Sequence, residues 1–262
     1  MSLLKFIKLQ IKKILLYFYP DNGKRYVVRT GIAKGFYRVG GFDYLKWFYK
    51  ESKEVKFLKA LKLKNKVVYD VGANAGMFSL FLASSVKSSG KVYSFEPNPI
   101  CYDLLKKNID LNSFSNVKTY NFAIGAKNYT DKLLFDPAWT GTGTLNSNIQ
   151  DNMKNIEEVK VNVVSMDNFI PEMKIPVPDF VKIDVEGLEY DVLSGMKDTL
   201  KNIKPKLFIE IHGLTYYDKE KNIINIVSLL EKFKYKILHV ESGELINKNN
   251  AISAKIGHIY CT

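Results

Sequence analysis

Two acidic side chains stand where two apolar runs of the sequence end, and both could bind a ligand there. Asp70 closes a run of β-forming residues and is followed by a turn containing Gly72 and Gly76. The apolar segment 77–83 after this turn is typical of a helix, and Glu96 closes the next run. A strand, a glycine turn and a helix in this order are typical of the first unit of a nucleotide-binding α/β fold.

The spacing of the glycines indicates which nucleotide would bind. The pattern is Asp followed by Gly-x-x-x-Gly, not the Gly-x-Gly-x-x-Gly that brings a backbone close to a dinucleotide pyrophosphate. Asp70 would repel a phosphate, but it would suit the ammonium group of S-adenosylmethionine (SAM), and Glu96 could accept both ribose hydroxyls. Gly72 would let the backbone approach the cofactor, while Asn74 and Gly76 would shape the turn. The sequence therefore predicts a SAM-dependent methyltransferase.

A second group of polar residues follows later strands. Asp184 ends the predicted fourth strand, and ligands of open α/β sheets bind beyond such carboxyl ends, so we expect Asp184 near the methyl group. A hydroxyl acceptor needs a general base or a metal ion that lowers its pKa. His212 could take the proton while an acid orients it, or Asp184 and Glu210 could hold Mg²⁺. We favour the metal-free base, with Asp184, His212 and Glu210 as catalytic residues and no metal ligand assigned.

The remaining acids and histidines near these strands have structural interpretations. Glu186 is expected to cap a helix and Glu189 to lie in its first turn, where a negative charge is favourable. We expect His239 and His258 to be core or sheet-edge residues, because both fall within or beside late strands.

The order of the predicted elements favours a parallel sheet. Strands alternate with helices, which is typical of short crossover connections. The last two strands have no helix between them and should pair antiparallel. The long segment 137–155 is rich in Gly, Thr and Asn and is interpreted as a substrate loop. Strands are predicted at about 67–71, 92–96, 117–122, 131–136, 159–164, 179–183, 206–211, 235–240 and 256–261, and helices at about 52–63, 99–111, 188–200 and 219–233.

Length and charge limit the functional classes. A chain of 262 residues fits one large α/β domain with a short N-terminal addition. The net charge of +12 raises nucleic-acid binding as an option, but only three of the 39 basic residues are arginine, the residue favoured for phosphate and base contacts. Nucleic acid is therefore not the expected partner. Cys101 and Cys261 form no metal or redox motif. Two cysteines in a chain of this length suggest a reducing compartment, so the expected location is the cytoplasm.

The N-terminal segment differs from the rest of the chain. Residues 3–19 place lysines on one side of a helical wheel and apolar residues on another, with no acid among the first 20 residues. Such a basic amphipathic helix could lie on the anionic inner face of a membrane. It could instead pack on the domain or on a partner. We divide the chain into this helix (1–20), a hairpin and helix extension (21–64) and a methyltransferase domain (65–262).

A third motif completes a family resemblance. Residues 181–196 read Val-Lys-Ile-Asp-Val-Glu-Gly-Leu-Glu-Tyr-Asp-Val-Leu-Ser-Gly-Met, and with 68–76 and 95–98 they closely resemble the FkbM-like methyltransferases. The likeness extends to 121–125, which include Ala123. It implies a Rossmann-like class I fold with helices on both faces of a seven-stranded, mostly parallel sheet and an antiparallel last strand. It also implies that Ala123 lies beside the adenine and that the enzyme is an O-methyltransferase.

These observations predict a SAM-dependent O-methyltransferase that acts on a hydroxyl, in a sugar of a lipid-linked or surface glycan. One alternative is an RNA methyltransferase that uses the lysine-rich surface, with binding that depends steeply on salt. Another is a domain that binds SAM or a membrane without turnover.

Overall fold

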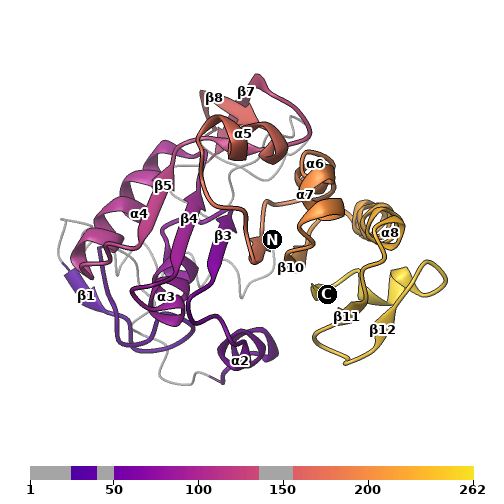
Figure 1. The fold of residues 1–262 in the computed structure, drawn as a ribbon, viewed down its shortest axis with the longest axis horizontal. Coiled ribbons are helices and arrows are strands. Elements are labelled where there is room, and N and C mark those ends of the chain that lie inside the picture. The colour runs from indigo at the N-terminus through magenta and orange to yellow at the C-terminus, as the bar shows by residue number, and fades with distance from the viewer. Residues whose placement is uncertain (1–24, 40–49, 136–155) are drawn as a thin grey trace, which may run out of the picture.

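The computed structural model describes residues 25–39, 50–135 and 156–262. The predicted helix at 1–20 and the substrate loop at 137–155 lie outside these residues. In the described part of the chain, the main sheet has eight strands and helices on both faces, which confirms the predicted α/β, Rossmann-like class (Figure 1). The strands run in the order β12 (Leu245–Ile246), β11 (Ile237–His239), β13 (Gly257–Cys261), β10 (Lys206–Ile211), β9 (Phe180–Ile183), β3 (Val67–Val71), β4 (Lys91–Phe95) and β5 (Val117–Tyr120).

The pairing follows the connections. Strands β10, β9, β3, β4 and β5 are parallel, because helices connect most of them along the chain. β13 lies between β10 and β11 and is antiparallel to both, which confirms the prediction for the last strand. The short strand β12 pairs with the end of β11 and adds one strand to the expected seven.

The two faces of the sheet bury different side chains. One face carries Tyr69, Val71 and Phe95 together with other apolar residues and packs against four helices. The opposite face carries Val68 and Phe180, and its core includes residues of α2 and α3. Figure 1 shows the two sets of helices on either side of the strands. The first face is covered by α5 (Met166–Glu172), α6 (Glu189–Ser194), α7 (Lys197–Asn202) and α8 (Tyr216–Lys232), the second by α2 (Lys53–Ala60), α3 (Met77–Val86) and α4 (Pro99–Leu111).

Local sequence signals explain where several helices begin. The side chain of Asn98 accepts hydrogen bonds from the first-turn amides of α4, and Pro99 occupies the first turn. Thr215 and Asp218 form a reciprocal capping box at the start of α8. The single helix predicted at 188–200 is divided into α6 and α7 at Gly195, where a Cβ atom would overlap the carbonyl oxygen of Gly125.

Two small sheets lie apart from the main one. The strands predicted at 131–136 and 159–164 do not join the main sheet. They form an antiparallel pair, β7 (Tyr129–Phe135) and β8 (Glu157–Val164), and β6 (Ala123–Ile124) is parallel to β8. Near the N-terminus, β1 (Arg25–Val27) and β2 (Tyr37–Val39) pair antiparallel, and a short 3₁₀ helix, η3 (Ala251–Ala254), precedes β13. Among the described residues, no helix is both long enough and apolar enough to cross a membrane.

Candidate active site

The glycine turn after β3 is held against its neighbouring strands. Gly72 has a φ of +81°, and a Cβ atom there would overlap the backbone oxygen of Asp184 at the end of β9. Its amide and that of Ala73 donate to the carbonyl oxygen of Phe95 on β4. Gly76 has a φ of +87° and lies against Leu105 of α4. Position 72 therefore requires glycine because β3 and β9 are in close contact there. The sequence did not indicate this contact.

Glu96 lies at the carboxyl end of β4 and is fixed by the same turn. One carboxylate oxygen accepts the amide of Asn74 at 2.7 Å and the other accepts the amide of Asn98 at 2.8 Å. Burial raises the pKa of Glu96 to about 7, although these two hydrogen bonds act to lower it. A carboxylate offers about four lone pairs, so two amide donors leave acceptor sites for ribose hydroxyls.

Asp70 lies near the end of β3. Its side chain is fully buried, accepts a hydrogen bond from Ser79 Oγ at 2.6 Å, and lies 3.7 Å from the ammonium group of Lys182. Asp70 therefore links the end of β3 to α3 and β9, and its contact with a cofactor ammonium group stays a prediction.

Lys182 is a residue that the sequence reasoning did not use. It lies directly opposite Asp70 across β3 and β9, is only 2% exposed, and binds Asp184 at 2.9 Å. Its ammonium group also lies 4.3 Å from the centre of the Phe78 ring. Burial acts to lower the pKa of Lys182, but the carboxylates of Asp184 and Asp70 outweigh it and raise the pKa. The sequence did offer one signal for the role of Lys182, because it is a lysine in the middle of an apolar strand.

Ala123 lies in β6, outside the main sheet, and is nearly buried. Two residues earlier, the amide group of Asn121 donates to the backbone oxygens of Glu96 and Pro97. The segment that leads to Ala123 is thus tied to the end of β4.

The three predicted catalytic residues come together at the ends of β9 and β10. The Nε2 atom of His212 lies 3.4 Å from a carboxylate oxygen of Glu210 and 3.8 Å from one of Asp184. Glu186 contributes a third carboxylate at 3.9 Å. Oxygen and nitrogen atoms of Asp184, Glu210 and His212 lie within 4.8 Å of one another, so this group could also hold a metal ion.

Glu189 orients His212, a role that the sequence reasoning did not assign to it. It is fully buried in the first turn of α6, and its Oε1 lies 2.9 Å from His212 Nδ1. Its other oxygen accepts from the amide of Asn222 on α8, which also donates to the backbone oxygen of His212. An Nδ1–H bonded to Glu189 leaves Nε2 to face the open cluster of carboxylates.

The carboxylates strongly perturb the histidine. Burial acts to lower the pKa of His212, but hydrogen bonds with Glu189 and Glu210 outweigh it and raise the pKa to about 11. Burial alone would raise the pKa of Glu210, whereas the neighbouring imidazoles of His212 and His258 hold it well below the usual range. In the ligand-free protein His212 therefore carries a proton at neutral pH.

Known proteins are similar to this chain over the segment that carries these residues. The family model for the methyltransferase FkbM domain matches residues 70–237. A fungal protein named Methyltransferase 1, from Beauveria bassiana, is 28% identical over 159 residues, which are 55% of this chain and 64% of that protein. The hexuronic acid methyltransferase AglP of Haloferax volcanii is 28% identical over 148 residues, 56% of each chain. The chain thus spans less than two thirds of the length of these relatives.

A solved structure extends the comparison to the fold. The crystal structure of a methyltransferase FkbM from Methylobacillus flagellatus aligns with a TM-score of 0.51 and 18% identity, over 78% of this chain and 45% of that one. The family match covers well over half of the sequence and includes Asp70, Glu96, Asp184 and His212. The chain belongs to the FkbM methyltransferase family.

Proposed function

We propose that this protein transfers the methyl group of SAM to a hydroxyl group, with the proton of the hydroxyl passing to His212. The observation that carries the proposal is the placement of His212. Its Nδ1 atom is bound to the buried Glu189, and its Nε2 atom faces Asp184 and Glu210 at the end of the sheet.

The topology supports a SAM site beside these residues. The chain runs from β3 outward to β5 and then resumes at β9 on the other side of β3, so the strand order reverses between β3 and β9. Ligands of open α/β sheets bind at such a switch point. Glu96, at the end of β4, offers acceptors for a ribose, and the carboxylate of Glu186 suits a neighbouring cation. Bound there, SAM supplies an electrophilic methyl group on a positively charged sulfur.

The base must first lose its own proton. His212 would lose this proton to the solvent when a cation binds beside it, because a nearby positive charge lowers the pKa of an imidazolium ion. Neutral His212 could then accept the proton while Asp184 and Glu210 position the hydroxyl. The metal alternative, with Mg²⁺ held by Asp184 and Glu210, uses the same oxygen atoms.

We infer that the acceptor is a sugar, in a lipid-linked or surface glycan. AglP is named a hexuronic acid methyltransferase, and its similarity supports a carbohydrate acceptor. The basic segment 3–19 would bring the enzyme to the inner face of an anionic membrane, where such glycans are built. In this proposal the divisions 1–20, 21–64 and 65–262 correspond to membrane contact, extension and catalysis.

Transfer of radiolabelled methyl groups from SAM into separated cell fractions tests the acceptor. We expect label in the membrane or glycan fraction and no requirement for Mg²⁺. Label in RNA would establish the RNA methyltransferase alternative, and loss of transfer with EDTA that Mg²⁺ restores and Zn²⁺ does not would establish the Mg²⁺ mechanism. Binding of SAM without transfer to any fraction would indicate a non-catalytic domain.

Substitution of the base tests the assignment of residues. We expect His212→Gln to lower kcat by about 10²–10⁴-fold, the usual contribution of a general base, without weakening the binding of SAM. Asp184→Asn should also lose turnover and retain SAM. His239→Gln is a matched control, since His239 is a buried histidine whose ring nitrogens bond to Ser242 and the Ile256 backbone. Full activity of His212→Gln would contradict the proposal.

A further inference from the structure

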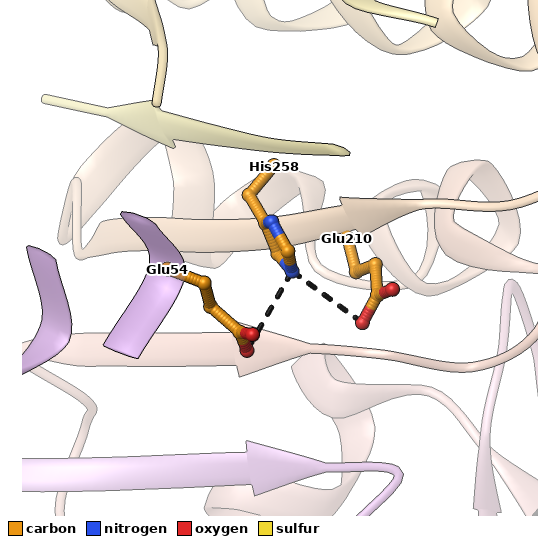
Figure 2. Close-up of side chains that lie close together, drawn as sticks. All are labelled: Glu54, Glu210 and His258. Atoms are coloured by element: carbon orange, nitrogen blue, oxygen red, sulfur yellow. Dashed lines mark ion pairs between the residues drawn. The ribbon is translucent and has the colours of Figure 1, made fainter. Parts of the chain in front are cut away.

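A second histidine lies on the other side of Glu210. His258 of β13 pairs directly with Glu210 of β10, and its Nε2 atom lies 3.5 Å from Glu210 Oε2. Glu54 reaches the same point from α2, with Oε1 at 3.6 Å from Nε2. Figure 2 shows the three side chains converging from two strands and one helix. The interpretation of His258 as a core or sheet-edge residue did not anticipate this convergence.

The free nitrogen of His258 lacks a hydrogen bond. The residue is only 8% exposed, and Nε2 is buried without a hydrogen-bond partner. The other ring nitrogen, Nδ1, lies 2.7 Å from Glu241 Oε1, and the backbone amide of His258 donates to the second oxygen of Glu241. Because Nδ1–H donates to Glu241, Nε2 is the ring nitrogen left to bind a metal ion, and it faces the carboxylates of Glu54 and Glu210. Two carboxylates attract a positive charge at this point, either a proton on Nε2 or a metal ion in its place.

The distances are those of ligands around a small ion. Nitrogen and oxygen ligands bind zinc at about 2.0–2.2 Å, so two ligand atoms of a tetrahedral site lie roughly 3.4 Å apart. The separations of 3.5 and 3.6 Å from Nε2 to the two glutamates agree with this value. They exceed the usual hydrogen-bond length, which is about 2.7–3.2 Å for an N–H and an oxygen atom.

The charge of the pocket also favours a cation. The carboxylates of Glu54, Glu210 and Glu241 surround the imidazole of His258, while the buried Lys182 is bound to Asp184 and Asp70.

We propose that Glu54, Glu210 and His258 bind a divalent transition-metal ion of the zinc type, and that Glu241 orients His258 from the second side of the ring. The ligand set of one imidazole and two carboxylates leaves a position for water. This site is distinct from the reaction centre, although Glu210 belongs to both. Because Glu54 lies on α2, the ion fastens this helix to the main sheet.

Titration of Zn²⁺ into the full chain without an affinity tag tests the proposal by calorimetry. We expect one equivalent to bind, more weakly at acid pH because protons compete for His258. Glu54→Gln and His258→Gln should each weaken binding at least tenfold, and His212→Gln should not. Glu220→Gln is the matched control, since Glu220 pairs with Lys255 away from the pocket.

Hydrogen exchange of the unsubstituted protein gives a readout that needs no variant. Zn²⁺ should slow exchange of the amides of α2, because Glu54 ties this helix to the ion. Absence of stoichiometric Zn²⁺ binding would overturn the proposal. Binding that is lost in His212→Gln but kept in Glu54→Gln, with unchanged exchange in α2, would also overturn it and place the ion at the reaction centre.

Discussion

The two faces of the main sheet are both buried, but they are built from different chemistry. On the face toward α5–α8, neighbouring strands present apolar and aromatic rings, among them Tyr69, Phe95 and Tyr120, packed against Phe169. On the face toward α2 and α3, a row of polar residues runs across three strands, with Ser94, Asp70 and Lys182 in register. The row continues to the carboxylates and histidines at the ends of β9, β10 and β13.

This difference shows how one sheet can separate stability from chemistry. The aromatic face can be stabilised by burial alone, which is tolerant of small changes in shape. The polar face depends on complete pairing, because a buried charge without its partner is costly. Substitutions of similar size should therefore have unequal effects on the two faces.

The largest effect is expected for Lys182→Met, which removes the buried cation and leaves Asp70 and Asp184 without their partner. Breaking a buried ion pair from one side lowers the free energy of unfolding by about 3–5 kcal/mol. Urea denaturation measures this loss. Ile183→Val, on the next residue and the opposite face, should lose only about 0.5–1.5 kcal/mol.

A second substitution sharpens this comparison. Asp70→Asn in the Lys182→Met background should restore part of the stability, because it removes one of the stranded carboxylates. If Lys182→Met were no more destabilising than Ile183→Val, the two faces would not differ in the proposed way.

A smaller effect is expected at Glu96, at the end of the polar face. Because burial raises the pKa of Glu96 to about 7, its carboxylate forms as the pH rises through neutrality, and SAM should bind more tightly at about pH 8 than at pH 6. Calorimetry at both values measures this. Glu96→Gln should weaken binding at pH 8 by about 1.5–3 kcal/mol and abolish the Glu96 contribution to the pH dependence.

The same pKa shift has the opposite sign for the ligand-free protein. A carboxyl whose pKa in the folded protein lies above its ordinary value of 4.5 destabilises the fold when it ionises, so the free energy of unfolding should fall as the pH rises from 4.5 through 7. For the binding prediction, an affinity for SAM that does not change with pH would show that the carboxylate of Glu96 does not contact SAM.

The smallest effect is expected for Tyr69→Phe, on the aromatic face. The hydroxyl of Tyr69 donates to the backbone oxygen of Pro176 at 2.7 Å, and loss of one such bond removes about 0.5–1.5 kcal/mol from the free energy of unfolding. The ring itself remains in place. A loss comparable with that of Lys182→Met would mean that the aromatic face also depends on its polar groups.

The edge of the sheet where the site lies could be predicted from the sequence, because the strands that carry the site residues were predicted to be parallel. Parallel neighbours end at the same edge, so Asp184 and the pair Glu210 and His212 had to meet once β9 and β10 were assigned. The antiparallel last strand followed from the missing helix before it. Both inferences needed only the direction of each strand.

Features that depend on side-chain direction could not be predicted in this way. Whether Glu189 turns toward solvent or back to His212 depends on the left-handed residues Glu186 and Gly187 that precede α6. Glu54 is far from Glu210 in sequence, and no spacing rule connects a helix before the first parallel strand with the fifth. The separate sheet of β7 and β8 likewise results from a direct antiparallel pairing that the alternation of strands and helices concealed.

The packing of α2 affects how the chain can be divided in experiments. Val55 and Leu58 of this helix are buried in the same core as Phe180 and Phe208, and the ring of Phe57 contacts Phe208 and Tyr260. The family match begins only at residue 70. A chain truncated to those limits would expose apolar strand surface to water and is expected to aggregate. The smallest unit suitable for expression therefore begins before α2 and extends through β13.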